Sequence, residues 1–252
     1  ESDALMALTA CYDGMQSPNL YNDNIDDWKF GFLGRETSTD NGDHTWGTWM
    51  LGSSISQCTS ATTDECFSMY WNANYEVIKR CNILIENVER VPMEQEKIEA
   101  YKAEAIALRA LMYCNLTSVF RDVPYLTKPL TLAEAQAPKT ERSQIISSLL
   151  EDLKIWIPKI QVIGKAQTGR LSQEAAYAIM GRIALFNQHW DEAITAYNNV
   201  IGKVQLFKSG DGSDYAANFA DLFKEVNETA SEVLLSCLLY TSPSPRDRQK
   251  SR

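Results

Sequence analysis

Histidine is scarce in this chain: only His44 and His189 occur among its 252 residues, which leaves little material for a zinc enzyme. Basic residues are outnumbered, with 24 Lys and Arg against 33 Asp and Glu, whereas nucleic-acid binders normally carry a basic surplus. No apolar run approaches the roughly 20 residues of a membrane-spanning helix. These shortages argue against a metal site, a nucleic-acid partner and an integral membrane helix.

Catalytic motifs are equally scarce. The sequence has no G-x-S-x-G, no phosphate-cradling glycine loop and no C-x-x-C among its six cysteines. The segments 40–43 and 211–214 resemble fragments of calcium loops, but they lack the spaced ligands and the closing Glu, so turn chemistry explains them better. Close pairs of acids are expected by chance among 33 acidic residues. We therefore expect a protein that is not an enzyme and that needs no cofactor.

The strongest positive signal is helical periodicity. Apolar residues recur at helical spacing in seven segments, and no long alternating strand pattern occurs. Residues 16–64 form a long stretch without a period, and residues 233–237 allow one short strand. The fold class predicted is all-α, with helical hairpins joined by long irregular loops. The predicted helices cover residues 3–15, 67–88, 95–119, 141–157, 173–186, 190–203 and 216–224.

One pair of helices matches a known repeat. Tyr177-x-x-Met180-Gly181 is followed by Ala193-x-x-x-Tyr197, which is close to the tetratricopeptide pattern of W-x-x-L-G followed by A-x-x-x-F. Small residues at Gly181 and Ala193 allow two antiparallel helices to touch closely. Such hairpins stack on one another, because one alone cannot bury its apolar faces.

The cysteines and the two chain ends leave alternatives open. Cys58 and Cys66 flank a polar loop, and they form either a local disulfide, as in an exported protein, or free thiols. The chain starts at Glu1 without a visible signal peptide, so either a leader was removed or the chain is a fragment. Residues 238–252 are abruptly basic and rich in Ser and Pro. They form either a disordered basic tail or a non-native stretch joined to a truncated gene.

The order of five sequence blocks resembles the SusD/RagB family of nutrient-binding outer-membrane lipoproteins of Bacteroidetes. The resemblance covers about residues 1–237 and corresponds to the N-terminal half of such proteins. Arg121 stands where the family usually has a glycine. The blocks are Tyr75-x-x-Ile78-x-x-x-Asn82-x-Leu84-Ile85, Glu104-Ala105-x-x-Leu108-Arg109-Ala110-Leu111-x-Tyr113 leading into Asp122-Val123-Pro124, Gly169-Arg170-Leu171-Ser172-x-x-Ala175-Ala176, the repeat above, and Tyr215-x-x-x-Phe219-x-x-Leu222-Phe223 with Ser231-Glu232-Val233.

The resemblance implies a helical, tetratricopeptide-containing protein at the cell surface, in the outer membrane, that binds glycans or other nutrients. It implies delivery of an oligosaccharide to a SusC-like TonB-dependent transporter, and anchoring through an N-terminal lipid on a cysteine that this chain lacks. The domain organisation expected is a SusD-like helical region over residues 1–237 and the tail at 238–252. The alternative is a tetratricopeptide scaffold that binds a protein or peptide.

Candidate ligand-binding residues lie in the irregular stretch. Sugar rings present apolar C–H faces and a rim of hydroxyls, so their sites combine exposed aromatic rings with polar side chains. Residues 28–49 have this composition and contain three of the six tryptophans. The alternative is that these tryptophans anchor a long loop onto the helices. The residues predicted to bind the ligand are Arg35, Asn41, Asp43, His44, Trp46 and Trp49.

Overall fold

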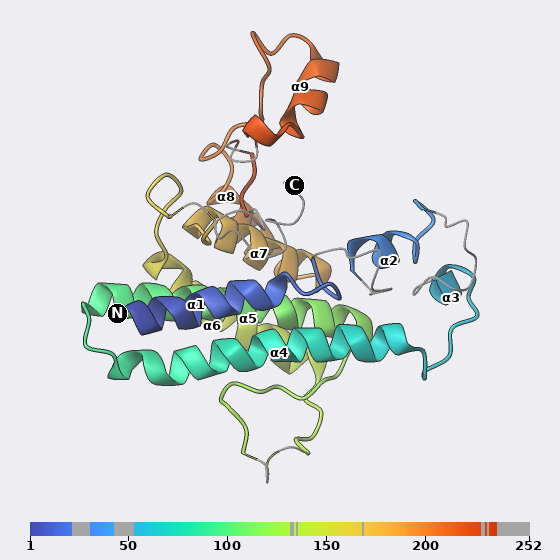
Figure 1. Ribbon diagram of the computed structural model, residues 1–252, viewed down its shortest axis with the longest axis vertical. Coiled ribbons are helices and arrows are strands. Elements are labelled where there is room, and N and C mark those ends of the chain that lie inside the picture. Colours follow the sequence, from blue (N-terminus) through green and yellow to red (C-terminus); the bar gives the residue numbers. More distant parts are fainter. Residues whose placement is uncertain are drawn as a thin grey trace, which may run out of the picture. The chain divides into compact units, whose positions relative to one another are not determined.

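The computed structural model describes residues 1–21, 31–42, 53–131, 134, 136–167, 169–227, 230 and 232–235. The chain divides into two compact units, Glu1–Ser147 and Ser148–Arg252, and each is considered by itself. Across the described residues the regular structure is helical, with two isolated β-bridges (Figure 1). The prediction of an all-α fold is confirmed. The predicted boundary between residues 237 and 238 lies outside the described part of the chain.

Three long helices form the body of the first unit: α1 (Ser2–Met15), α4 (Glu65–Asn87) and α5 (Gln95–Phe120). They lie side by side, with α1 packed against both of the others (Figure 1). Every residue of α5 from Ala103 to Cys114 is buried. This helix is therefore buried around most of its circumference, as expected for a central helix.

The backbone at the end of α5 favours a glycine at the position that Arg121 occupies. Arg121 follows the helix with a φ of 65°, in the left-handed region that a glycine enters without steric cost. A glycine is therefore the natural residue at this position, and the arginine occupies it under strain.

The connector after Arg121 is held by buried polar side chains. Asn82 of α4 donates to the carbonyls of Leu126 (2.9 Å) and Lys128 (3.4 Å). Arg109 of α5 donates to Asn82 Oδ1 at 2.8 Å and to the Thr127 carbonyl at 3.1 Å. Buried polar groups stabilise a fold when they are paired in this way. The Asn82 and Arg109 of the sequence blocks are thus structural residues that fix the connector.

Two short helices interrupt the stretch predicted to be irregular: α2 (Phe32–Glu36) and α3 (Ser53–Ser56). Each is too short to produce a readable helical period. Cys58 and Cys66 follow in the same unit, and both are free thiols in the structure.

The second unit contains most of α6 (Arg142–Trp156), which begins in the first, followed by α7 (Gln173–Phe186), α8 (Trp190–Asn198) and α9 (Tyr215–Leu222). Ser172 caps α7 by accepting the backbone N–H of Ala175 at 3.2 Å. The helix predicted over 190–203 ends earlier, at Asn198, and Gly202 adopts a φ of 80° in the turn that follows. Residues 233–235 form no strand. None of the helices in the described ranges is long and apolar enough to cross a membrane.

The α7–α8 hairpin confirms the helix pair predicted from the tetratricopeptide pattern. A Cβ atom placed on Gly181 would lie 2.8 Å from the Cε1 and Cζ atoms of Tyr197, so only glycine allows this approach of the two helices. Ala193 is buried at the same interface. The spacing of small and aromatic residues therefore corresponds to a real contact.

The buried tyrosines make the first unit sensitive to alkali. Burial raises the pKa of Tyr70 to about 12, and burial also raises the pKa values of Tyr75 and Tyr113. A tyrosine ionises near pH 10 in the unfolded chain, so above that pH the unfolded state loses a proton that the folded state keeps. Below pH 10 these tyrosines are protonated in both states, so their ionisation does not lower the free energy of unfolding there. It is expected to fall by roughly 1.4 kcal/mol for each pH unit between about 10 and 12 through Tyr70 alone.

Thermal melts between pH 9 and pH 12 test this expectation. Tyr70→Phe should flatten the alkaline decline of the melting temperature, whereas Tyr215→Phe, at a position 85% exposed, should leave it unchanged. An equal decline in both variants would contradict the assignment to the buried phenol.

Candidate functional site

Arg35 ties the first part of the irregular stretch to the helical body. It lies in α2, and its Nη2 donates to the carbonyl of Leu20 while Nε donates to the Gly31 carbonyl at 3.4 Å. Its guanidinium carbon lies 5.2 Å from the ring centroid of Tyr21 and 5.9 Å from that of Tyr70. Such cation–π contacts are favourable where the cation is partly desolvated. Arg35 therefore holds the segment against α4.

Asn41 lies near the end of the same described segment and is exposed. Its backbone N–H donates to Thr39 Oγ1 at 3.2 Å, as in a turn. This contact does not use the side-chain amide of Asn41. The other four predicted ligand-binding residues, Asp43, His44, Trp46 and Trp49, lie outside the described residues. Arg35 and Asn41 thus lie in one described segment, residues 31–42, which precedes the other predicted binding residues in the sequence.

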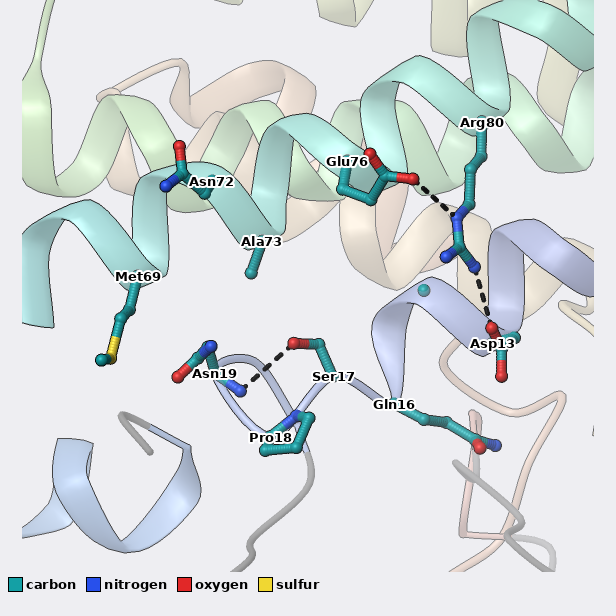
Figure 2. A pocket seen from close by; sticks show the side chains of 11 residues that line it. Asp13, Gln16, Ser17, Pro18, Asn19, Met69, Asn72, Ala73, Glu76 and Arg80 are labelled. Carbon is teal, nitrogen blue, oxygen red and sulfur yellow. Dashed lines mark hydrogen bonds and ion pairs between the residues drawn. The ribbon is translucent and has the colours of Figure 1, made fainter. Parts of the chain in front are cut away.

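A hollow of about 550 Å³ opens where the end of α1 meets α4 (Figure 2). One wall is the last turn of α1 and the turn after it, and the other wall is one face of α4. We name it the α1–α4 hollow. It is lined by Asp13, Gly14, Gln16, Ser17, Pro18, Asn19, Met69, Asn72, Ala73, Glu76 and Arg80.

Arg80 joins the two walls at one end of the hollow. Its Nη1 donates to Asp13 Oδ2 at 2.8 Å and its Nε donates to Glu76 Oε1 at 3.3 Å (Figure 2). The same Nη1 also donates to the Ala10 carbonyl at 2.8 Å. The hydrogen bond to Asp13 raises the pKa of Arg80, with a smaller contribution from Glu76. Because the side chains of Asp13 and Glu76 are 69% and 48% exposed, these pairs are screened by water and add little stability. Their effect is to orient two carboxylates beside the opening.

The rest of the lining combines polar groups with small apolar ones. Met69, Asn72 and Ala73 line the hollow from α4, and Ser17, Pro18 and Asn19 line it from the turn; Ala73 points toward the turn in Figure 2. Ser17 Oγ accepts the backbone N–H of Asn19 at 3.3 Å, which fixes the turn. Amides and hydroxyls both donate and accept hydrogen bonds. The hollow therefore offers both donors and acceptors beside small apolar surfaces.

The α1–α4 hollow was not predicted from the sequence. Its α4 residues 69, 73, 76 and 80 are spaced by three or four along the helix, and residue 72 lies three after 69 and four before 76, so they border one face. That face lies beside the buried stripe of Tyr70, Asn74, Val77 and Cys81. The helical spacing was available as a signal, but the opposite wall comes from α1 and could be assigned only after the packing was known. In the part of the chain that the structure describes, no three His, Cys, Asp or Glu side chains are arranged to hold a metal ion.

The chain is similar to a set of known proteins over most of its length. Residues 13–185 match the SusD-like family model described as starch-binding and associating with the outer membrane. SusD-like protein P25 of Formosa agariphila is 25% identical over 251 residues, which cover 94% of this chain and 44% of that protein. A SusD-like protein of Bacteroides ovatus is 24% identical over 182 residues, covering 69% of this chain and 33% of that protein. The chain thus spans less than half the length of these relatives.

Solved structures show the same fold. A laminarin-binding SusD-like protein superposes with a TM-score of 0.72 at 28% identity, covering 90% of this chain and 50% of that one. Surface glycan-binding protein A from Bacteroides uniformis superposes with a TM-score of 0.73 at 20% identity, covering 93% and 51%.

Proposed function

Because this chain belongs to the SusD-like family, described as starch-binding and associating with the outer membrane, we propose that it binds a carbohydrate nutrient without chemically transforming it. The observation that carries the proposal is the family match over residues 13–185. The laminarin-binding relative at 28% identity supports it. The protein acts at the outer surface of the outer membrane, held there by a lipid on an N-terminal cysteine, and passes an oligosaccharide to a SusC-like TonB-dependent transporter.

The proposed ligand contacts combine stacking and hydrogen bonding. Trp46 and Trp49 stack on the apolar faces of sugar rings, while Asn41, Asp43 and His44 meet the hydroxyl rim. Arg35 belongs to the site as the residue that fixes its base, since its contacts with Leu20, Tyr21 and Tyr70 hold the start of the segment. The net charge of −9 favours a neutral glycan over an anionic one, because like charges repel.

The α1–α4 hollow provides a further place for a sugar unit. Its volume of about 550 Å³ lies within the range of roughly 300–1,000 Å³ that is typical of small-molecule pockets. Asn72 offers both a donor and an acceptor there, and Ala73 and Met69 offer apolar contact.

Isothermal calorimetry with starch and laminarin oligosaccharides tests the proposed function, with an anionic polysaccharide as the comparison. Binding to a neutral glycan that changes little between low and high salt is expected, because a neutral sugar brings no charge to screen. Absence of binding to a broad array of neutral glycans, with the protein folded, would contradict the proposal.

Asn72→Ala tests the hollow in the same assay. Loss of one hydrogen bond to the ligand is expected to weaken binding about 2- to 12-fold. Asn87→Ala makes the same change on the same helix at an exposed position outside the hollow, and it should bind as the parent does. Equal affinity in both variants would remove the hollow from the binding surface.

A protein-binding scaffold is the second candidate function. The α7–α8 hairpin supports it, because Phe186, Trp190 and Ile194 are 57–60% exposed there, and exposed apolar side chains in proximity mark interaction surfaces. A scaffold should retain a protein partner and ignore glycans, so the same calorimetric assay separates the two functions.

A further inference from the structure

Two thiols are buried in the interface between α1 and α4. Cys11 of α1 and Cys81 of α4 are both 0% exposed, and both are reduced in the structure. Buried cysteines usually behave as small apolar residues. Two buried cysteines that face each other from different helices can also form a disulfide.

The register of the two helices places these cysteines at the same level. A Cβ on Gly14 would lie 3.0 Å from Val77 Cγ2, and Arg80 reaches the Ala10 carbonyl at 2.8 Å. The helices run antiparallel (Figure 1), so moving three residues back from Gly14 along α1 corresponds to moving three or four forward from Val77 along α4. Cys11 therefore lies opposite residues 80–81 of α4.

Close packing of two helices is compatible with a disulfide between them. Glycine at position 14 allows a close approach, and packed helices have axes about 8–10 Å apart with Cα atoms about 2.3 Å from each axis. Facing Cα atoms at such a contact come within the roughly 4.4–6.8 Å that disulfides require.

The surroundings of the two thiols affect how readily they react. Cys11 Sγ donates to the Ala7 carbonyl at 3.3 Å. The neighbouring Cys11 thiol and burial raise the pKa of Cys81 well above its ordinary value. Because the thiolate is the species that reacts, exchange in the folded protein is expected to be slow. Oxidation is therefore expected while α1 and α4 are still coming together.

We propose that Cys11 and Cys81 form an interhelical disulfide when the chain folds in an oxidising compartment. The oxidant is another disulfide, either small-molecule or on a thiol–disulfide oxidoreductase. One thiolate attacks it to give a mixed disulfide, and the second thiolate displaces the leaving thiol. Two protons and two electrons leave the cysteines, and the oxidising disulfide is reduced to two thiols. The chemistry is independent of the proposed function, and only the expectation of an oxidising setting rests on it.

The link has a consequence for the ligand-binding region. It closes the chain segment from residue 11 to residue 81, which contains α2, α3, the turn of the α1–α4 hollow and the whole predicted binding loop. It also joins the two helices that form the walls of the hollow. The disulfide thus restrains both ends of the segment in which the candidate binding residues lie.

The test compares the full chain produced in an oxidising compartment with the same chain produced in a reducing one. Each sample is denatured, its thiols are counted and alkylated, and its peptides are mapped by mass spectrometry without reduction. The oxidised sample is expected to lose two of its six thiols and to contain a peptide in which Cys11 is linked to Cys81. Its melting temperature should be higher by about 10 °C.

Two variants serve as controls. Cys81→Ala should abolish both the linked peptide and the difference in melting temperature, whereas Cys58→Ser, at an exposed cysteine, should keep both. Six free thiols in the oxidised parent, or a link from Cys11 or Cys81 to another cysteine, would overturn the proposal. The peptide map of the parent decides the matter even where a variant does not fold.

Discussion

Replacing Trp46 or Trp49 by alanine is expected to weaken glycan binding about 5- to 150-fold. Stacking buries apolar area worth roughly 25 cal/mol per Å², so loss of one indole ring from a sugar contact should cost roughly 1–3 kcal/mol of binding free energy. The two tryptophans lie in a polar segment that contains glycines and has no helical periodicity. No apolar pattern therefore marks them as core residues. Calorimetry with a cognate neutral glycan measures the effect.

The matched control is Trp190→Ala. Trp190 begins α8 and is 57% exposed, so the same side chain is removed at an exposed position that does not belong to the predicted loop. All three variants should be compared at equal foldedness, judged by melting temperature. If Trp46→Ala and Trp49→Ala fold normally and bind the glycan as tightly as Trp190→Ala does, the two tryptophans anchor the loop and the binding site lies elsewhere.

Gly181→Leu should destabilise the second unit by roughly 1–3 kcal/mol. Even a Cβ atom at this position would lie 2.8 Å from the Tyr197 ring, so a leucine forces α7 and α8 apart or displaces the tyrosine. Thermal or urea unfolding measures the loss. Arg182→Leu introduces the same side chain at the next, exposed position of α7 and should change stability little.

A double variant sharpens this test. Replacing Tyr197 by alanine in the Gly181→Leu background removes the ring that the leucine would meet, so part of the lost stability should return. Purely additive losses would mean that the leucine acts through some other contact, and that the tetratricopeptide-like packing does not depend on this glycine.

The long helices were predictable because their signal is local. α4, α5 and α7 were expected at nearly their observed bounds, since apolar residues three and four apart reveal a buried face within a single segment. The short helices α2 and α3 were not predictable, because four or five residues do not complete enough turns to establish a period. The end of α8 was predicted too late, because the apolar pattern continues through Val200 and Ile201 after the helix has ended at Asn198.

The candidate site was only partly predictable for the same reason. Arg35 was singled out by composition as a ligand-binding residue, and only the packing showed that it lies against Tyr21 and Tyr70. The α1–α4 hollow went unnoticed, since Asp13 and Arg80 are distant in the chain and meet only when α1 packs on α4. Composition can select residue types that suit a ligand, but it cannot select the partners that use up their hydrogen-bonding groups.

By itself, the sequence determined the helical class of this protein, the positions of its long helices and the glycine that lets α7 touch α8. These features depend on neighbours within a few residues or on a spacing that recurs in one repeat. Only the tertiary structure decided which distant side chains meet: Arg80 with Asp13, Asn82 with the connector, and Cys11 with Cys81. Those pairings depend on the register of one helix against another, which is set by the packing of entire helix faces.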